Sequence, residues 1–245
     1  MRDVRQTTYP VVSEKLETPV RILFVSDLHF GTAMDVERLR AYCDEMQETK
    51  PDLVLLGGDI VDESTGKADM QAAFAALGSI ESTYGTYFVY GNHDRANYAS
   101  SRPYSAQELE AAILDSGIVI LRDERVQAGE LTLCGTEDLS SRSRLPAAEL
   151  LKDADGAGLT LVLSHQPGGA EEYAAAGADL MLSGHTHDGQ IWPLGYINAL
   201  IGPKYGEYTF GDMTLLVSSG ICGWGYPVRT QGVSEYVLID LLPAG

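Results

Sequence analysis

All five histidines of the sequence lie in short segments at the ends of strand-like runs, and aspartate and asparagine occupy the same kind of position. The histidines are His29, His93, His165, His185 and His187, and the accompanying residues are Asp27, Asp59, Asn92 and Asp94. Each segment follows an apolar run typical of a buried strand, in FVSDLH, LLGGD, FVYGNHD, LVLSH and LMLSGHTH. Imidazole, carboxylate and amide groups together are typical ligands of divalent metals, although this mixture does not identify the metal. A polar loop residue or a turn-forming aspartate would explain any one position, but repetition at five strand ends favours one shared site.

The hydrophobic patterns predict the elements that would position these residues. In the first half, strands expected at 20–27, 51–59 and 85–92 alternate with helices expected at 35–49, 69–80 and 105–117. This alternation is typical of a layered α/β protein with largely parallel strands. The second half contains six more strand-like runs, at 117–123, 130–138, 159–167, 178–185, 213–219 and 234–241, with short helical stretches at 146–154 and 168–177. So many strands indicate two mixed β-sheets packed face to face and flanked by helices. Because the functional crevice of open α/β sheets lies beyond the carboxyl ends of the strands, the five segments should meet in space.

The composition limits the class of protein. The chain has 245 residues, 44% of them hydrophobic, and no linker-like segment divides it, so we expect one domain over 1–245. No apolar run approaches the roughly 20 residues of a membrane-spanning helix, and the first 20 residues lack the apolar core of a signal peptide. We therefore expect a soluble, cytoplasmic protein. Membrane association or export is the alternative if the natural chain carries a further N-terminal segment.

The charge and the cysteines exclude other classes. With 17 basic and 35 acidic residues the net charge is −18, which disfavours binding to nucleic acid or to anionic membranes. Cys43, Cys134 and Cys222 are far apart and form no CxxC motif, so we expect reduced, buried thiols rather than disulfides or a zinc knuckle.

The number of candidate ligands indicates two metal ions rather than one. Seven ligands are too many for a single tetrahedral ion, whereas two ions that share a carboxylate would use them all. Asp59 is the natural bridge, because the preceding glycines allow close approach of the backbone.

Five motifs carry a resemblance to a known family. They are DxH at 27–29, GGDxVD at 57–62, GNHD at 91–94, SHQP at 164–167 and GHTHxGQ at 184–190. In this order they resemble the signature of the calcineurin-like metallophosphoesterases, in particular the bacterial single-domain GHTHxGQ subgroup. The resemblance implies a four-layer α/β/β/α sandwich, in agreement with the strand count. It also implies two divalent or transition metal ions, with Mn, Fe or Zn as candidates.

The resemblance further assigns roles to individual residues. One ion would be held by Asp27, His29, Asp59 and His187, and the other by Asp59, Asn92, His165 and His185. His93 would donate a proton to the leaving group, with Asp94 holding its ring. The alternative for His93 is a histidine that only supports the metal ligands.

These residues predict a hydrolase. Two ions would lower the pKa of a shared water to give a hydroxide nucleophile and would make the cleft locally cationic on an acidic protein. We expect hydrolysis of phosphodiester or pyrophosphate bonds, with a phosphomonoesterase or a non-catalytic metal-binding scaffold as alternatives. Metallo-β-lactamases and amidohydrolases also use HxH pairs, but the residues around this pair do not match theirs.

The substrate is indicated only by class. Seven of the 20 aromatic residues lie between 190 and 226, namely Trp192, Tyr196, Tyr205, Tyr208, Phe210, Trp224 and Tyr226. This segment would either wall a pocket for a lipid-like group or form a long loop packed on the body. The subgroup resemblance implies a lipid-linked or nucleotide-type phosphoester and permits peripheral membrane contact. Asp188 departs from the subgroup, where glycine is frequent. Arg95 and Arg229 are candidate phosphate contacts, or else merely solvated.

Overall fold

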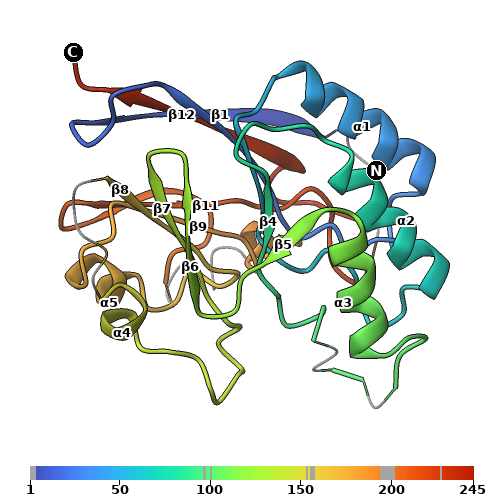
Figure 1. The fold of residues 1–245 in the computed structure, drawn as a ribbon. Helices are drawn as coiled ribbons and strands as arrows, with labels where there is room; N and C mark the ends of the chain where they lie inside the picture. Colours follow the sequence, from blue (N-terminus) through green and yellow to red (C-terminus); the bar gives the residue numbers. More distant parts are fainter. Residues whose placement is uncertain are drawn as a thin grey trace.

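Two six-stranded sheets lie between two groups of helices (Figure 1), which confirms the expected α/β sandwich. The computed structural model describes residues 4–95, 98–99, 101–152, 154, 158–193, 202–226 and 228–245. In spatial order the first sheet comprises β1 (Arg5–Ser13), β12 (Glu235–Pro243), β2 (Val20–Val25), β3 (Leu53–Leu56), β4 (Thr86–Phe88) and β5 (Ile118–Ile120). The second comprises β10 (Gly206–Phe210), β11 (Met213–Val217), β9 (Leu180–Ser183), β8 (Leu159–Leu163), β7 (Leu131–Gly135) and β6 (Glu124–Ala128). The helices are α1 (Val36–Glu48), α2 (Lys67–Gly78), α3 (Ala106–Asp115), α4 (Ala147–Leu150) and α5 (Ala170–Ala175), and a 3-10 turn, η1, spans His187–Gly189.

The strands that precede the predicted ligands run parallel. β2, β3, β4 and β5 form one parallel set, and β7, β8, β9 and β11 form another. Antiparallel pairs occur only toward the edges of the described sheets, between β12 and β2, β6 and β7, and β10 and β11. In each sheet, the carboxyl ends of the parallel strands therefore lie along the same edge.

Alternation along β2 shows how the layers are held together. Successive side chains of a strand point to opposite faces. Ile22 and Phe24 accordingly belong to the core between the two sheets, whereas Leu23 and Val25 belong to the core beneath the helices. A strand buried on both faces has a continuous apolar sequence, which is why 22–25 is uniformly apolar.

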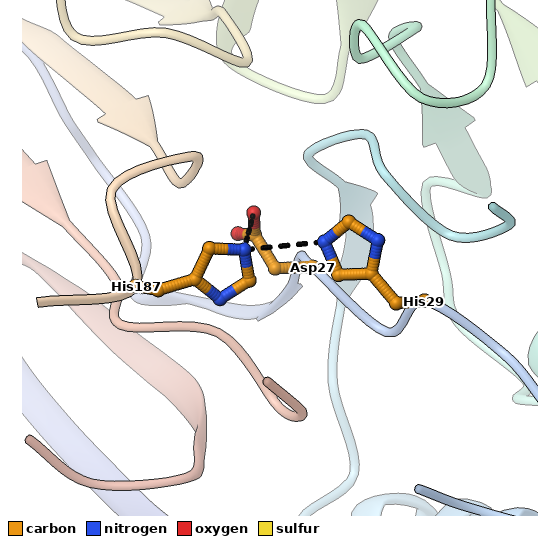
Figure 2. A group of neighbouring side chains, drawn as sticks. All are labelled: Asp27, His29 and His187. Carbon is orange, nitrogen blue, oxygen red and sulfur yellow. Dashed lines mark hydrogen bonds and ion pairs between the residues drawn. The ribbon is translucent and has the colours of Figure 1, made fainter. Parts of the chain in front are cut away.

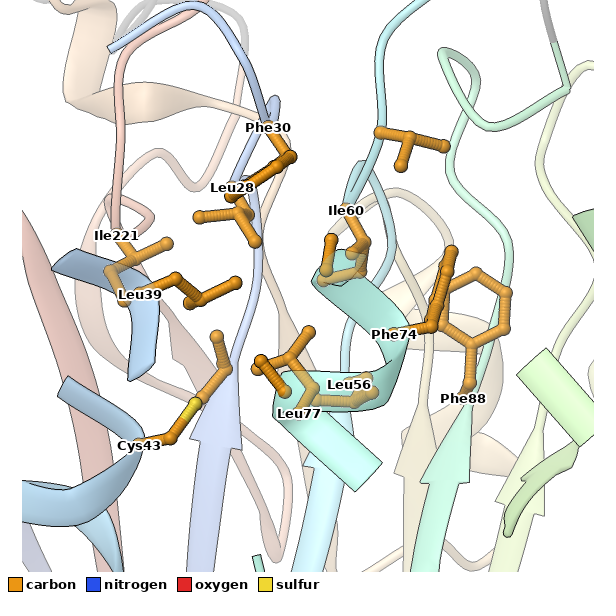
Figure 3. Close-up of a cluster of buried hydrophobic side chains, with 14 of the residues drawn as sticks. Leu28, Phe30, Leu39, Cys43, Leu56, Ile60, Phe74, Leu77, Phe88 and Ile221 are labelled. Atoms are coloured by element: carbon orange, nitrogen blue, oxygen red, sulfur yellow. The ribbon is translucent and has the colours of Figure 1, made fainter. Parts of the chain in front are cut away.

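Helices α1, α2 and α3 cover the outer face of the first sheet (Figure 1). α1 begins after Asp35, whose carboxylate accepts a hydrogen bond from the N–H of Arg38 at 2.9 Å, as expected for an N-cap. Its buried residues are Leu39, Tyr42, Cys43 and Met46, which confirms the predicted face. Figure 3 shows Leu39 and Cys43 of α1 and Phe74 and Leu77 of α2 in one cluster with Leu56 of β3.

A third core lies on the outer face of the second sheet. There Val162, Met181 and Leu215 pack with Ala170 and Tyr173 of α5. The order of layers is therefore helix, sheet, sheet, helix. None of the helices in the described parts of the chain is both long and apolar enough to cross a lipid bilayer.

Three strands were not predicted from the sequence. β1 is an edge strand with alternating exposure and contains Pro10, which an edge position tolerates since one side of the strand has no partner. β6 is short and largely exposed. β10 lies within the aromatic segment 190–226, so the described part of that segment is not simply a long loop.

Candidate metal centre

The predicted site residues follow five neighbouring strands, as the parallel topology requires. Asp27 and His29 follow β2, Asp59 follows β3, and Asn92 and His93 follow β4. His165 follows β8, and His185 and His187 follow β9. All of them are buried except His185, which is half-buried. The two sheets thus contribute to one site from their facing carboxyl edges.

One group comprises Asp27, His29 and His187 (Figure 2). The Nε2 atoms of His29 and His187 lie 3.1 Å apart, and Nε2 of His187 lies 3.5 Å from Oδ1 of Asp27. Asp27 also accepts hydrogen bonds from the backbone N–H of His185 at 3.0 and 3.1 Å. The β2 and β9 loops are therefore joined at this carboxylate.

A second group comprises Asp59, His165 and His185. Nε2 of His165 lies 3.1 Å from Oδ2 of Asp59 and 3.2 Å from Nδ1 of His185. Nδ1 of His165 lies 2.7 Å from the carbonyl oxygen of Gly57, so the ring donates there and leaves Nε2 for the group.

Asp59 connects the two groups. Its Oδ2 lies 3.1 Å from His165 of the second group and 3.8 Å from Nε2 of His29 in the first. Its Oδ1 accepts the backbone N–H of His93 at 2.8 Å, which fixes the carboxylate orientation. Gly58 has φ +87°, and a Cβ there would lie 2.6 Å from the nitrogen of Gly91, so the turn before Asp59 requires glycine.

Asn92 is buried beside the second group. Its Oδ1 lies 3.5 Å from Nε2 of Gln166, the residue after His165, and Gln166 also donates to Asp138. The amide is thus placed next to the segment that supplies His165. Asp138 was not singled out from the sequence, because it lies outside the motifs.

The backbone is strained at these positions. Asp27, His29, Asp59, His185 and His187 have φ of 55°, 41°, 52°, 70° and 50°. Such left-handed conformations are uncommon for residues other than glycine and cost roughly 1–3 kcal/mol each. Strain of this kind collects at functional sites, where the surrounding fold imposes it.

The electrostatics of the buried groups favour ionised carboxylates. Burial alone would raise the pKa of Asp59, but the adjacent His165 and His29 lower it below its usual value. Burial alone would lower the pKa of His165, but Asp59 raises it to about 10. Burial lowers the pKa of His187 to about 3. The carboxylate of Asp59 is therefore ionised and the imidazole of His187 is unprotonated, and these are the states that bind a cation.

The residues present fit two metal ions. In each group the candidate ligand atoms lie within 4.8 Å of one another. Two imidazole nitrogens facing each other at 3.1 Å cannot both keep a free lone pair without a proton or cation between them. The donors are nitrogen and oxygen atoms, a combination that suits Zn, Mn or Fe.

Asp94 differs from its expected role. Its carboxylate does not contact the ring of His93 but accepts hydrogen bonds from four backbone N–H groups, those of Asp59, Ile60, Val61 and Gly91, at 2.7 to 3.1 Å. Both oxygens are therefore occupied in holding the β3 and β4 loops together. The expectation that Asp94 holds the His93 ring is not met, because both carboxylate oxygens accept hydrogen bonds from backbone N–H groups.

The carboxylate within hydrogen-bond distance of the His93 ring is that of Glu63. Its Oε2 lies 2.8 Å from Nδ1 of His93. Asp62, the last residue of the GGDxVD motif, lies 3.3 Å from Nδ1 of His29 and 3.9 Å from Nδ1 of His93. Sequence reasoning missed both carboxylates as site residues, although Asp62 lies in a quoted motif.

Gln190 and Arg229 organise the backbone around the histidine pair. Nε2 of Gln190 donates to the carbonyls of Trp224, Tyr226 and Val228 at 3.0 to 3.2 Å, and its Oε1 accepts the N–H of Trp224 at 2.7 Å. The guanidinium of Arg229 donates to three carbonyls, those of His187, Ser219 and Cys222. Arg229 therefore supports the ligand loop instead of facing a phosphate.

Arg95 and Asp188 also make internal contacts. Arg95 pairs with Glu137 and lies 3.9 Å from the centre of the Tyr90 ring. Asp188 is buried with φ 49°, and its Oδ1 lies 3.2 Å from Nζ of Lys204. Aspartate tolerates left-handed backbone better than most residues, so it can adopt this conformation in place of glycine.

Aromatic side chains and a cavity flank the site. The rings of Tyr98 and Trp224 lie 4.9 and 5.5 Å from the ring of His93, and both are more than half exposed. A cavity of about 420 Å³ adjoins His185, and it is lined by Leu139, Gln166, Pro167, Gly168, Thr186, Gly202, Pro203 and Lys204. Trp192 and Tyr226 are exposed, and Tyr208 and Phe210 lie in β10. Tyr196 lies outside the described residues.

The sequence model of the calcineurin-like phosphoesterase family matches residues 20–189, more than half of the chain. The chain belongs to this family. This phosphoesterase is 33% identical over 242 residues to an uncharacterized metallophosphoesterase of Helicobacter pylori. The matched region covers 96% of this chain and 63% of that protein. It is 30% identical over 239 residues to a transmembrane protein with metallophosphoesterase domain of Danio rerio, with 92% and 54% covered. The chain thus spans less than two thirds of the length of both relatives.

Solved structures support the fold of this phosphoesterase. A crystal structure from Thermus thermophilus matches with a TM-score of 0.54 at 15% identity, covering 84% of this chain and 92% of that one. A purple acid phosphatase from yellow lupin seeds matches with a TM-score of 0.53 at 11% identity, covering 94% and 55%. Identities this low show a shared fold. Family membership and the buried His/Asp groups together make this chain a metallophosphoesterase.

Proposed function

We propose that this phosphoesterase hydrolyses phosphodiester or pyrophosphate bonds with two metal ions. The observation that carries the proposal is the pair of buried His/Asp groups joined by Asp59, whose Oδ2 lies within 3.8 Å of a histidine from each group. Asp27, His29 and His187 would hold one ion, and Asn92, His165 and His185 the other, with Asp59 between them. When bound, the two ions would activate a water nucleophile and offset the charge of the phosphoryl oxygens.

The protein's own residues would perform the remaining steps. His93 is the one described histidine outside the two ligand sets, and its ring lies 4.9 Å from the ring of His29. It can donate a proton to the leaving oxygen as the bond from phosphorus to that oxygen breaks, while water supplies the oxygen that stays on phosphorus. Proton donation of this kind contributes about 10²–10⁴-fold to the rate.

The surroundings of the site favour a phosphorus centre with two substituents. Tyr98 and Trp224 lie on the His93 side, whereas the cavity of about 420 Å³ opens beside His185 and shares none of these aromatic residues. A monoester has one organic group and would leave one of these surfaces unused. A diester or pyrophosphate would place its leaving group against the aromatic rings and its retained group in the cavity.

The lining of both surfaces indicates an amphiphilic or ring-containing substrate. Leu139, Pro167 and Pro203 give the cavity apolar walls, and Lys204, which also pairs with Asp188, adds a cation to the lining. Exposed Trp224 offers a flat surface on which a nucleobase or an acyl chain can pack. We therefore propose a lipid-linked or nucleotide-type phosphoester, with peripheral membrane contact for the former.

The test combines metal analysis with a substrate panel. Purified protein loaded with Mn, Fe or Zn is assayed against matched monoesters, diesters and pyrophosphates that carry aryl, nucleoside or acyl groups. We expect about two metal ions per chain, loss of both on Asp59→Asn, and turnover of diesters or pyrophosphates at least ten times faster than of monoesters. Faster monoester turnover would make the protein a phosphomonoesterase. Metal-loaded protein inert toward the whole panel would make it a binding scaffold.

A further inference from the structure

We propose that Glu63 is the positioning residue that orients the imidazole of His93 for proton donation. This proposal rests on the proposed hydrolytic function. Glu63 directly follows the GGDxVD motif and was not among the predicted site residues. Oε2 of Glu63 lies 2.8 Å from Nδ1 of His93, which is a normal hydrogen-bond distance. The side chain of Glu63 is 11% exposed, so water competes little for this carboxylate.

The other nearby carboxylates are engaged elsewhere. Asp62 is 3.9 Å from Nδ1 of His93 but 3.3 Å from Nδ1 of His29. Asp94 is filled by four backbone N–H groups. The adjacent residues Asp62 and Glu63, whose side chains also contact each other, thus divide two tasks. Asp62 orients a predicted metal ligand, and Glu63 orients the predicted proton donor.

The hydrogen bond to Glu63 determines which ring nitrogen meets the substrate. A carboxylate can only accept, so Nδ1 of His93 must carry a proton. The reactive proton is then on Nε2, at the other side of the ring. In the reaction the bond from phosphorus to the leaving oxygen breaks, and the Nε2 proton moves to that oxygen. The ring keeps its Nδ1–H hydrogen bond to Glu63, and Nε2 then takes up a new proton from water.

Glu63 also links the ring to its aromatic neighbour. Its Oε1 lies 3.3 Å from the backbone nitrogen of Tyr98, whose ring is 4.9 Å from that of His93. By contrast, Gln190 holds the segment that contains Trp224, Tyr226 and Val228, here called the Trp224 loop. Within the described residues this loop makes no hydrogen bond with Glu63. Loss of Glu63 therefore frees the imidazole from one side while the Trp224 side stays in place.

The first experiment compares leaving groups in the metal-loaded enzyme. Two diesters that share the retained group are used, one with a 4-nitrophenolate leaving group and one with an alkoxide. Because an alkoxide needs a proton and 4-nitrophenolate does not, we expect Glu63→Ala to lower kcat about 10–100-fold for the alkyl ester and less than about 3-fold for the aryl ester. Glu63→Gln should retain most of kcat, since its amide oxygen can still accept from Nδ1.

The matched control is Asp62→Asn, the neighbouring carboxylate. It should lower metal affinity about 10–100-fold through His29, as substitutions of groups that orient ligands usually do. Glu63→Ala should bind the wild-type amount of metal. If Glu63→Ala loses metal, or slows both esters equally, Glu63 serves the metal site or the fold and the proposal is overturned.

A spectroscopic readout separates this proposal from the proposed function. In the zinc-loaded protein, long-range ¹H–¹⁵N spectra should show His93 protonated at Nδ1 in the wild type and in Glu63→Gln. In Glu63→Ala that Nδ1–H signal should be lost because the proton exchanges with water, or be replaced by the signal of the Nε2–H tautomer. An unchanged His93 spectrum in Glu63→Ala overturns the proposal. Wild-type protein that shows the Nδ1–H signal but hydrolyses no ester would instead refute the hydrolytic function.

Discussion

Removing the carboxylate of Asp94 should destabilise the protein far more than a surface substitution does. Asp94 is buried and accepts four backbone N–H groups from the loops after β3 and β4. In Asp94→Ala all four donors lose their partner. A buried donor left unsatisfied costs at least about 1 kcal/mol, so the free energy of unfolding should fall by about 4 kcal/mol. In a chain of this size each kcal/mol shifts Tm by roughly 2–4 °C, so Tm should fall by roughly 8–16 °C.

The loss should be graded by how many acceptors remain. Ile60 and Val61 donate to Oδ1, whereas Asp59 and Gly91 donate to Oδ2. Asp94→Asn keeps one oxygen and turns an amide N–H toward the other pair, so its stability should lie between that of wild type and of Asp94→Ala. Asp44→Asn, on the exposed face of α1, is the control and should change stability by less than about 0.5 kcal/mol.

The assay is urea or thermal unfolding followed by circular dichroism, together with hydrolysis measured well below Tm. If Asp94 instead acts by holding the His93 ring, Asp94→Ala would keep its Tm and lose activity selectively toward esters with poor leaving groups. A Tm within 2 °C of wild type, roughly the shift expected for a loss under 1 kcal/mol, would refute the reasoning from backbone donors.

Three further outcomes are expected. Chelation should abolish hydrolysis, and ions present at a hundred times their Kd add about 2.7 kcal/mol, so calorimetry should show Tm roughly 5–10 °C lower without metal. Gln190→Ala removes four hydrogen bonds to the Trp224 loop, so KM for aryl diesters should rise by about tenfold or more while metal content stays constant, whereas an unchanged KM would contradict a role for this loop in binding. Burial raises the pKa of Cys43 and Cys222 to about 12 and of Cys134 to about 11, so a thiol reagent at pH 8 should label none of them until urea unfolds the chain.

Much of the fold could be predicted because its strands are buried on both faces. Runs such as 22–25 and 53–56 are continuously apolar, and the polar residues that follow them mark one edge of the sheet. β1 escaped prediction because an edge strand is stabilised by its pairing with β12 and not by its own hydrophobicity. Similarly, β10 is held by β11 and reads as a loop on its own.

The site was predictable in composition but not in its hydrogen bonds. Chemical type and position at strand ends were enough to bring Asp27, His29 and Asp59 together in the prediction. The partner of His93, however, depends on how the loop after β3 turns, and spacing does not encode that path. Gln190 shows the same limit, because its role follows from the location of Trp224, 34 residues away in the chain.

The position of β12 has a consequence for the order in which the molecule can be assembled. This strand, the last in the described part of the sequence, lies between β1 and β2, and β2 leads directly into Asp27 and His29. During synthesis β2 can pair with β3 early, but its other edge stays open until residues 235–243 have left the ribosome. Since pairings so distant in sequence form slowly, the aspartate and histidine that begin the site are secured only after residues 235–243 have been synthesised. A nascent chain should therefore bind its metal only once residues 235–243 are available to pair with β2.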